Sequence, residues 1–245
     1  MYAMDPMTKE IRHLFESFEL FEDEKLMKGF IRVATLTLDR ADKILNSPDY
    51  GFDQPFDARF GKMMVKTGAH LLGAFGEVVY GFIHGEEIDV LLASVEESGP
   101  PPDGREIICR FSSESSGKMT LMLGEPVSFG VKLYEFPAPD VVKKFFVWRQ
   151  KTKKSEALDR YVKVALLANG TDLERISEKI QNLGDHEKIE VLRQQDISFS
   201  EVPGWQTRGV GLYWQAGVDD SEPSLMVELK LPAENDFDKY LGRFL

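Results

Sequence analysis

Three acidic residues stand where the strands of a small sheet would end. Asp39 closes a β-branched segment, FIRVATLTLD, while Glu86 and Glu87 lie in the HGEE turn between two short apolar runs. If those strands are neighbours, the carboxylates converge on one edge of the sheet. Carboxylate oxygens suit Mg²⁺, and two such ions can clamp the attacking and leaving oxygens of a phosphoryl displacement. The spacing predicts a metal-dependent phosphoryl-transfer site, although a single acid in a turn is usually only solvated.

A sheet with interleaved helices would have to position these acids. Hydrophobic periodicity predicts strands at 29–39, 77–83, 88–92 and 127–136, with helices at 56–75 and 105–123. The resulting order, β–α–β–β–α–β, is that of the ferredoxin-like fold, which polymerase palms and nucleotidyl cyclases share. We therefore predict an α+β fold, a ferredoxin-like polymerase palm.

Further elements are expected on both sides of this core. Helices are expected at 7–21, 138–149, 156–168, 173–182 and 186–194, and a C-terminal hairpin would pair 209–215 with 225–231. We accordingly divide the chain into three parts. These are an N-terminal helical extension (1–28), a palm domain (29–154), and a helical segment with a C-terminal β-hairpin that packs on the palm (155–245).

The bulk composition narrows the class of protein. The formal net charge is −11, which argues against a protein that coats nucleic acid without specificity. No apolar run approaches the roughly 20 residues of a membrane span, and the first residues lack an apolar signal core. The single cysteine, Cys109, allows no intrachain disulfide. We expect a cytoplasmic protein that does not enter a membrane.

One basic segment stands out against this acidic background. It predicts an RNA-binding track along a helix, with Trp148 as a possible stacking surface. The competing interpretations are a solvated helix end for the charges and a core position for Trp148. The basic residues are Lys143, Lys144, Arg149, Lys151, Lys153 and Lys154.

Four short segments, together with their order and spacing, carry a family resemblance. They read LDRAD at 38–42, QPFD at 54–57, GEE at 85–87 and WRQ at 148–150. The chain thereby resembles the tRNA-His guanylyltransferase family of 3′–5′ nucleotide-adding enzymes. That family carries D-G-R, K-P-x-D, S-D-E and W-R-Q segments in the same order. The resemblance runs from about residue 30 to residue 215, where RGVGLYWQ also fits.

The resemblance implies a function and a set of site residues. It implies transfer of a nucleotide from a nucleoside triphosphate, GTP or ATP, to the 5′ end of tRNA or another structured RNA. It also implies assembly as a homodimer or homotetramer. Asp39, Glu86 and Glu87 would be catalytic. Two Mg²⁺ ions would bind Asp39, Glu86 and the backbone carbonyl of Arg40, and the triphosphate would contact Lys132 and Arg208.

Several positions differ from the family pattern. Arg40 replaces a glycine, Ala41 replaces an arginine, Glu86 replaces an aspartate, and Gln54 replaces a lysine. Each lost cation removes a charge-assisted phosphate contact worth about 1.5–3 kcal/mol. The substitutions motivate an alternative, a catalytically impaired member that binds RNA or nucleotide as a regulatory protein. A palm that acts on free nucleotides without RNA is a third possibility.

Overall fold

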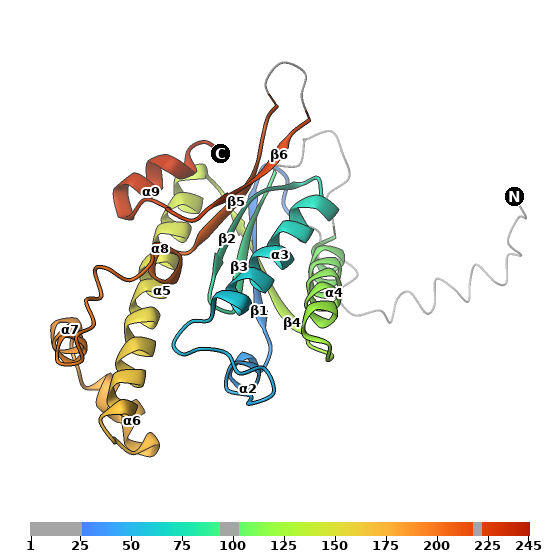
Figure 1. Cartoon of the computed structure of the whole chain (residues 1–245). Coiled ribbons are helices and arrows are strands. Elements are labelled where there is room, and N and C mark those ends of the chain that lie inside the picture. The colour runs from blue at the N-terminus through green and yellow to red at the C-terminus, as the bar shows by residue number, and fades with distance from the viewer. Residues whose placement is uncertain (1–25, 94–102, 218–221) are drawn as a thin grey trace, which may run out of the picture.

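The computed structural model describes residues 26–93, 103–217 and 222–245, and the helix expected at 7–21 lies outside them. Within these ranges the strands form one antiparallel sheet in the order β4-β1-β3-β2-β5-β6 (Figure 1). The first four strands have the ferredoxin-like order, which confirms the predicted palm. The strands are β1 (Ile31–Leu38), β2 (Val78–His84), β3 (Glu87–Leu92), β4 (Phe129–Phe136), β5 (Val210–Gln215) and β6 (Ser224–Glu228).

Helices cover both faces of this sheet (Figure 1). Helices α3 (Ala58–Ala74) and α4 (Gly104–Leu123) pack on one face, where alternate residues of β1, such as Leu36, enter the larger core. The carboxylates of Asp57 and Asp103 cap the first turns of these two helices. On the opposite face, α5 (Pro139–Ala168) buries Phe146 against Tyr80 and Phe82. The α5 face is also the face toward which Thr35 and Thr37 point.

Helix α5 runs unbroken for 30 residues, where we expected two helices, at 138–149 and 156–168. The intervening QKTKKS segment contains no glycine or proline, so nothing in it interrupts a helix. The expected domain boundary between 154 and 155 therefore falls inside α5. Helices α6 (Leu173–Gln181) and α7 (Asp185–Arg193) pack against its C-terminal half in a third, separate core.

Three short helices were not expected from the sequence. They are α2 (Ala41–Leu45), which directly follows the acid at the end of β1, α8 (Gly204–Thr207), which leads into β5, and α9 (Glu234–Leu241). Helix α9 completes the core beneath α5 by burying Phe237 and Leu241. Among the described residues, no helix combines the length and apolarity that a membrane crossing requires.

The glycine immediately before β5 is expected to be intolerant of any side chain. Gly209 has φ +80°, and a Cβ added there would lie 2.5 Å from Cε2 of Phe82 and 2.8 Å from the Ile83 carbonyl oxygen. Gly209→Ala should lower the free energy of unfolding by about 3 kcal/mol or more, because strain adds to overlap. Gly170 has φ +75° and open space around it, so Gly170→Ala should cost only about 1 kcal/mol. Urea unfolding of both variants checks the difference, and equal losses would contradict it.

Candidate functional site

The sheet brings the ends of β1 and β3 together, as the placement of the acids requires. Thr37 lies opposite Glu87 in the antiparallel pair, and the Leu38 N–H donates to the Glu86 carbonyl at 3.0 Å. Asp39 follows directly and is exposed. Its Oδ2 accepts from Ser128 Oγ at 2.8 Å, and its N–H donates to the Ser128 carbonyl. The backbones that carry Asp39 and Glu86 are therefore adjacent.

Arg40 holds the conformation that glycine would favour at this turn. Its φ is +55° and ψ +30°, in the left-handed region, and it serves as the N-cap of α2. A residue with a Cβ reaches this region at a cost of about 1 kcal/mol or more. The sharp turn after β1 is thus retained although the glycine is not.

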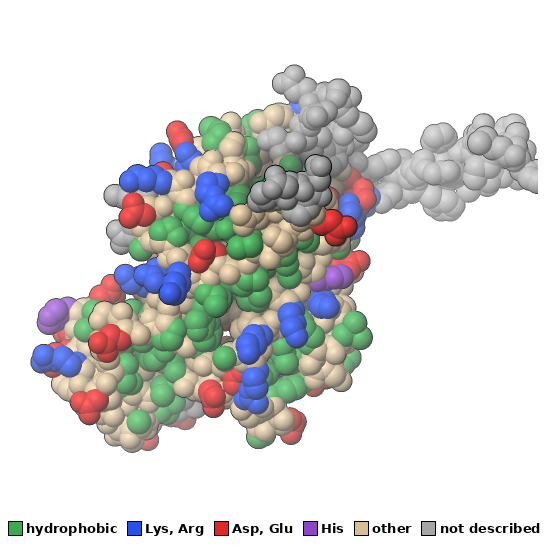
Figure 2. Space-filling view, turned by 45° about the horizontal axis from the view of Figure 1, so that its top comes forward, with side chains coloured by type: hydrophobic (Ala, Val, Ile, Leu, Met, Phe, Trp, Pro, Cys, Tyr) green, Lys and Arg blue, Asp and Glu red, His purple; other side chains and the backbone are tan. Residues whose placement is uncertain are grey.

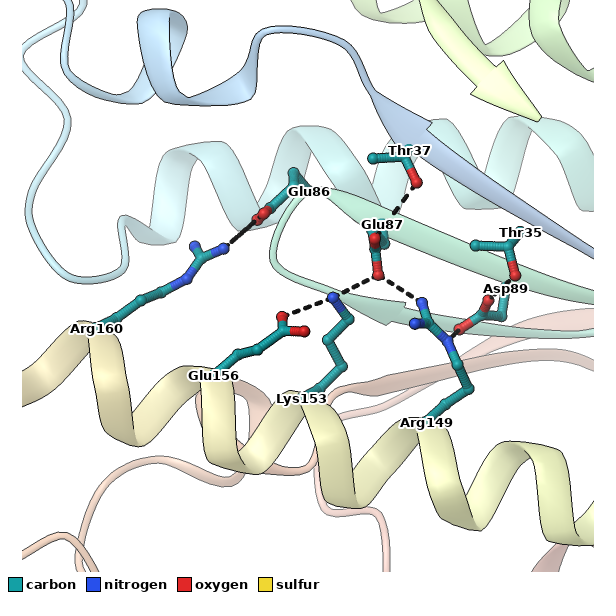
Figure 3. A network of polar contacts seen from close by, with 9 residues as sticks. All are labelled: Thr35, Thr37, Glu86, Glu87, Asp89, Arg149, Lys153, Glu156 and Arg160. Carbon is teal, nitrogen blue, oxygen red and sulfur yellow. Dashed lines mark hydrogen bonds and ion pairs between the residues drawn. The ribbon is translucent and has the colours of Figure 1, made fainter. Parts of the chain in front are cut away.

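Glu86 is bound by a guanidinium of α5. Arg160 Nη2 donates to both carboxylate oxygens of Glu86, at 2.6 Å to Oε1 and 2.5 Å to Oε2 (Figure 3). Partial burial disfavours the charged carboxylate, but the attraction and hydrogen bonds of Arg160 outweigh it and lower the pKa of Glu86. Glu86 is therefore ionised at neutral pH, and its charge is balanced within the protein.

Glu87 is bound by two further cations of the same helix. Its Oε2 lies 2.5 Å from both Lys153 Nζ and Arg149 Nη2, and Thr37 Oγ1 is 3.3 Å from its Oε1 (Figure 3). Partial burial opposes ionisation here too, but Lys153 and then Arg149 outweigh it and lower the pKa of Glu87. The two cations are themselves buried, with relative exposures of 4% for Lys153 and 8% for Arg149.

A third carboxylate of the network, Asp89, was not among the predicted site residues. It is 1% exposed and accepts from Arg149 Nε at 2.8 Å and from Thr35 Oγ1 at 2.5 Å. Burial raises its pKa, and Arg149 acts against that rise. The sequence signal was present in the EIDVLL strand, where Asp89 stands two residues after Glu87 and therefore points to the same face.

One stripe of α5 supplies all the cations of this network. Arg149, Lys153 and Arg160 are spaced by four and seven residues, which places them on the same side of a helix (Figure 3). Two members of the expected basic track, Arg149 and Lys153, thus face the sheet and lie buried. Trp148, by contrast, is 56% exposed and is not a core residue. The track members outside the network are Lys143, Lys144, Lys151 and Lys154, of which only Lys143 is partly covered.

The carboxylates do not fit a two-metal site as they stand. Among the described residues, no three Asp, Glu, His or Cys side chains form a group that could hold a metal ion. Both oxygens of Glu86 accept from a guanidinium, and one oxygen of Glu87 contacts two cations. Mg²⁺ at either group would have to displace a positive charge that already neutralises it.

A cavity of about 360 Å³ lies beside the β2–β3 turn. Its walls are largely apolar, and the aromatic rings of Phe56 and Trp205 meet edge to face at 6.1 Å. Arg160 lines the cavity as well, with its guanidinium carbon 5.4 Å from the Phe56 ring centre. Two exposed lysines, Lys62 and Lys66, line the same cavity. Arg160 therefore connects the cavity to the acidic turn.

His84 also lines this cavity but is not placed to bind a metal. It is 4% exposed, and its Nε2 lies 2.9 Å from the Gln206 carbonyl oxygen, to which it donates. Burial lowers the pKa of His84 to about 4, so the ring is neutral at pH 7. Its role in the described contacts is to tie β2 to α8.

The two residues expected to contact phosphate lie on different elements, Lys132 in β4 and Arg208 directly after α8. Lys132 is exposed in the middle of β4, opposite Thr35, and does not line the cavity beside the β2–β3 turn. Arg208 lines a second, larger cavity between α5 and α7. Among the described residues, neither Lys132 nor Arg208 forms a side-chain hydrogen bond or ion pair with Glu86 or Glu87.

Known proteins resemble this chain in structure. No family model matches the sequence, and no curated protein matches it. A bacterial tRNA(His) guanylyltransferase-like protein solved with GTP superposes with a TM-score of 0.75 at 15% identity, covering 98% of this chain and 99% of that one. Its complex with ATP gives 0.74 at 16% identity, covering 98% and 99%. The tRNA(His) guanylyltransferase of Saccharomyces cerevisiae gives 0.69 at 15% identity, covering 81% and 91%. This chain shares the fold of the tRNA(His) guanylyltransferases over almost its whole length.

Proposed function

We propose that this chain is a nucleoside-triphosphate-binding protein on a nucleotidyltransferase palm, in which the protein's own cations hold the phosphoryl-transfer acids. The observation that carries the proposal is the Arg160–Glu86 pair, because Glu86 stands where the second metal-binding acid is expected. Helix α5 contributes three positive charges and one negative charge at this position, because Glu156 pairs with Lys153 at 2.7 Å, whereas two Mg²⁺ ions would contribute four positive charges. Glu86 and Glu87 are thus paired with cations without a metal, and in this proposal they do not carry out transfer chemistry. Asp39 has no cation partner among the described residues.

The cavity beside the turn supports nucleotide binding. Its volume of about 360 Å³ is in the range of small-ligand sites. Phe56 and Trp205 offer aromatic edges and faces to a base, while Lys62 and Lys66 offer ammonium groups to phosphates. Neither lysine forms an ion pair with another described residue. The likeness to proteins solved with GTP and with ATP supports the same ligand class.

A second candidate is the Mg²⁺-dependent transfer of a nucleotide to the 5′ end of tRNA or a related RNA. Asp39 favours it, because this acid is exposed at the end of β1 and contacts no cation among the described residues. In that case Asp39, Glu86 and Glu87 would be catalytic. Arg160 would first have to leave Glu86. A homodimer or homotetramer would accord with either candidate.

Calorimetric titration of GTP and ATP into the full chain separates the two candidates, run once with EDTA and once with Mg²⁺. We expect binding in EDTA, because Lys62, Lys66 and the aromatic walls require no metal. Lys66→Gln should weaken that binding about tenfold, the effect of one lost charge-assisted contact. Lys163→Gln removes an exposed charge from α5 away from the cavity and serves as the control.

Incorporation of labelled nucleotide into a 5′-truncated tRNA completes the test. The proposal expects no incorporation by the wild type above that of Asp39→Ala. Incorporation that needs Mg²⁺ and is lost in Asp39→Ala would establish the second candidate instead. Failure of GTP and ATP to bind in either buffer would exclude the first.

A further inference from the structure

An apolar surface lies where β4 and α5 meet at one side of the sheet. β4 is the first strand in the sheet order, so one of its two edges pairs with no other described strand. The ring centres of Tyr134 and Phe136 each lie 5.3 Å from that of Phe145 on α5, which lies 5.8 Å from that of Trp148. Trp148 is 56% exposed, and Val141, on the same side of α5, is 37% exposed. We call these five residues the apolar edge.

Exposed lysines stand beside the apolar edge. Lys132 is exposed on the face of β4 that carries the rings, and Lys144 is exposed one helical turn before Trp148. Neither lysine forms an ion pair with another described residue, since the nearby Asp140 contacts Lys143, at 3.5 Å. Basic and acidic side chains are interspersed over the face shown in Figure 2, in a protein of net charge −11. A partner for the apolar edge should therefore be both apolar and acidic.

The described chain begins beside the apolar edge. The N–H of Met27 donates to Oε1 of Glu135 at 2.9 Å, and Glu135 stands between Tyr134 and Phe136 on β4. Five extended residues span up to about 17 Å. The segment 7–21, which precedes this contact by only a few residues, is therefore within reach of the apolar edge.

Segment 7–21 has the composition that this surface requires. Six carboxylates and one arginine stand among residues 10–24. The other two ranges outside the described structure, 94–102 and 218–221, hold one valine each and otherwise only polar residues, glycine and proline. The apolar residues of segment 7–21 that recur at helical spacing are Ile11, Leu14, Phe15 and Phe18.

We infer that segment 7–21 docks on the apolar edge of its own chain. Its apolar stripe would pack on the exposed rings, and its carboxylates would face Lys132 and Lys144. A segment docked there covers an unpaired strand edge, which would otherwise offer itself to a strand of a second copy. This inference does not depend on the proposed nucleotide cavity, which lies beside the β2–β3 turn.

Hydroxyl-radical footprinting of the full chain, read by mass spectrometry, tests the inference through the oxidation rate of Trp148. Leu14→Glu/Phe18→Glu removes two apolar contacts of the docked segment and should raise that rate at least about threefold. His13→Glu/Ser17→Glu adds the same formal charge on the opposite side of the expected helix and should leave the rate unchanged. Trp214, 44% exposed on β5, is the internal reference. Equal rates at Trp148 in the two variants, or a rise that Trp214 shares, overturns the inference.

Two further measurements test the lysines and the origin of the cover. Lys132→Glu/Lys144→Glu should also raise the oxidation rate of Trp148, whereas Lys163→Glu/Lys179→Glu, at exposed positions elsewhere, should not. The wild-type rate should stay constant across about a hundredfold dilution, because a contact within one chain does not depend on concentration. A rate that rises on dilution assigns the cover to a second copy of the chain and contradicts docking within one chain.

Discussion

Replacing Arg149 with methionine is expected to lower the free energy of unfolding by about 3–5 kcal/mol at pH 7. The change leaves the Asp89 carboxylate, which is 1% exposed, without its cation. Methionine keeps most of the apolar part of the arginine side chain. The loss of stability therefore reports the missing positive charge and not a loss of packing. Glu87 keeps Lys153 and should contribute little to the loss.

The same variant should show a characteristic dependence on pH. Burial already raises the pKa of Asp89, and removal of Arg149 should raise it further. A carboxyl whose pKa is higher in the folded than in the unfolded state stabilises the fold at low pH and loses that contribution as pH rises. The deficit of Arg149→Met should therefore be smaller at pH 5 than at pH 8, as urea unfolding at the two values would measure.

Two further variants check the cause. Asp89→Asn in the Arg149→Met background should recover a large part of the lost stability, because it removes the uncompensated charge. Arg110→Met alters an arginine that is 45% exposed and should cost less than about 1 kcal/mol. If Arg149→Met and Arg110→Met have equal costs, the buried pair is not what holds α5 to the sheet.

Replacing Arg160 with glutamine is expected to create affinity for a divalent cation. The change removes the guanidinium from both oxygens of Glu86, a group whose lowered pKa keeps it ionised. Asp39 lies next to it on the adjacent strand end and is exposed. Relief from one nearby positive charge should strengthen Mn²⁺ binding at least about tenfold, as measured by the electron paramagnetic resonance signal of the free ion.

The controls locate the gained site. Arg160→Gln/Asp39→Ala should lose the gain, and Lys163→Gln, which removes an exposed charge from the same helix, should not show one. Wild-type binding of Mn²⁺ as tight as that of Arg160→Gln, and abolished by Asp39→Ala, would show that the cation of α5 does not exclude metals. That result would support the hypothesis that Asp39 and Glu86 bind two metal ions.

The sequence predicted the sheet well because the signals for it are local. Strand alternation, the HGEE turn and the helix at 56–75 each depend on neighbouring residues, and together they give the strand order that places Asp39 beside Glu86. The helices α2 and α9 were missed because they are short. The break expected in α5 was an error of the opposite kind, because the helix continues through the lysine-rich segment between the two expected helices.

The candidate site was less predictable because its partners are distant in sequence. Arg149 lies 62 residues from Glu87, and Arg160 lies 74 residues from Glu86. A basic segment in an acidic protein suggests a surface for a polyanion, and no local pattern distinguishes a lysine that turns inward. The spacing of Arg149, Lys153 and Arg160 does mark one side of a helix, but only the fold shows that three acids face that side.

Because helix α5 is unbroken, the residues that it contributes to the acidic network and those that it contributes to the larger cavity have a fixed rotation relative to one another. A straight helix turns about 100° for each residue, and the 30 residues of α5 span about 45 Å. Deleting one residue between 154 and 158 would rotate Arg160 away from Glu86 and Leu158 away from the cavity, while Arg149 kept its place. Natural length variation should therefore be absent from this stretch and concentrate in the loops at either end of α5.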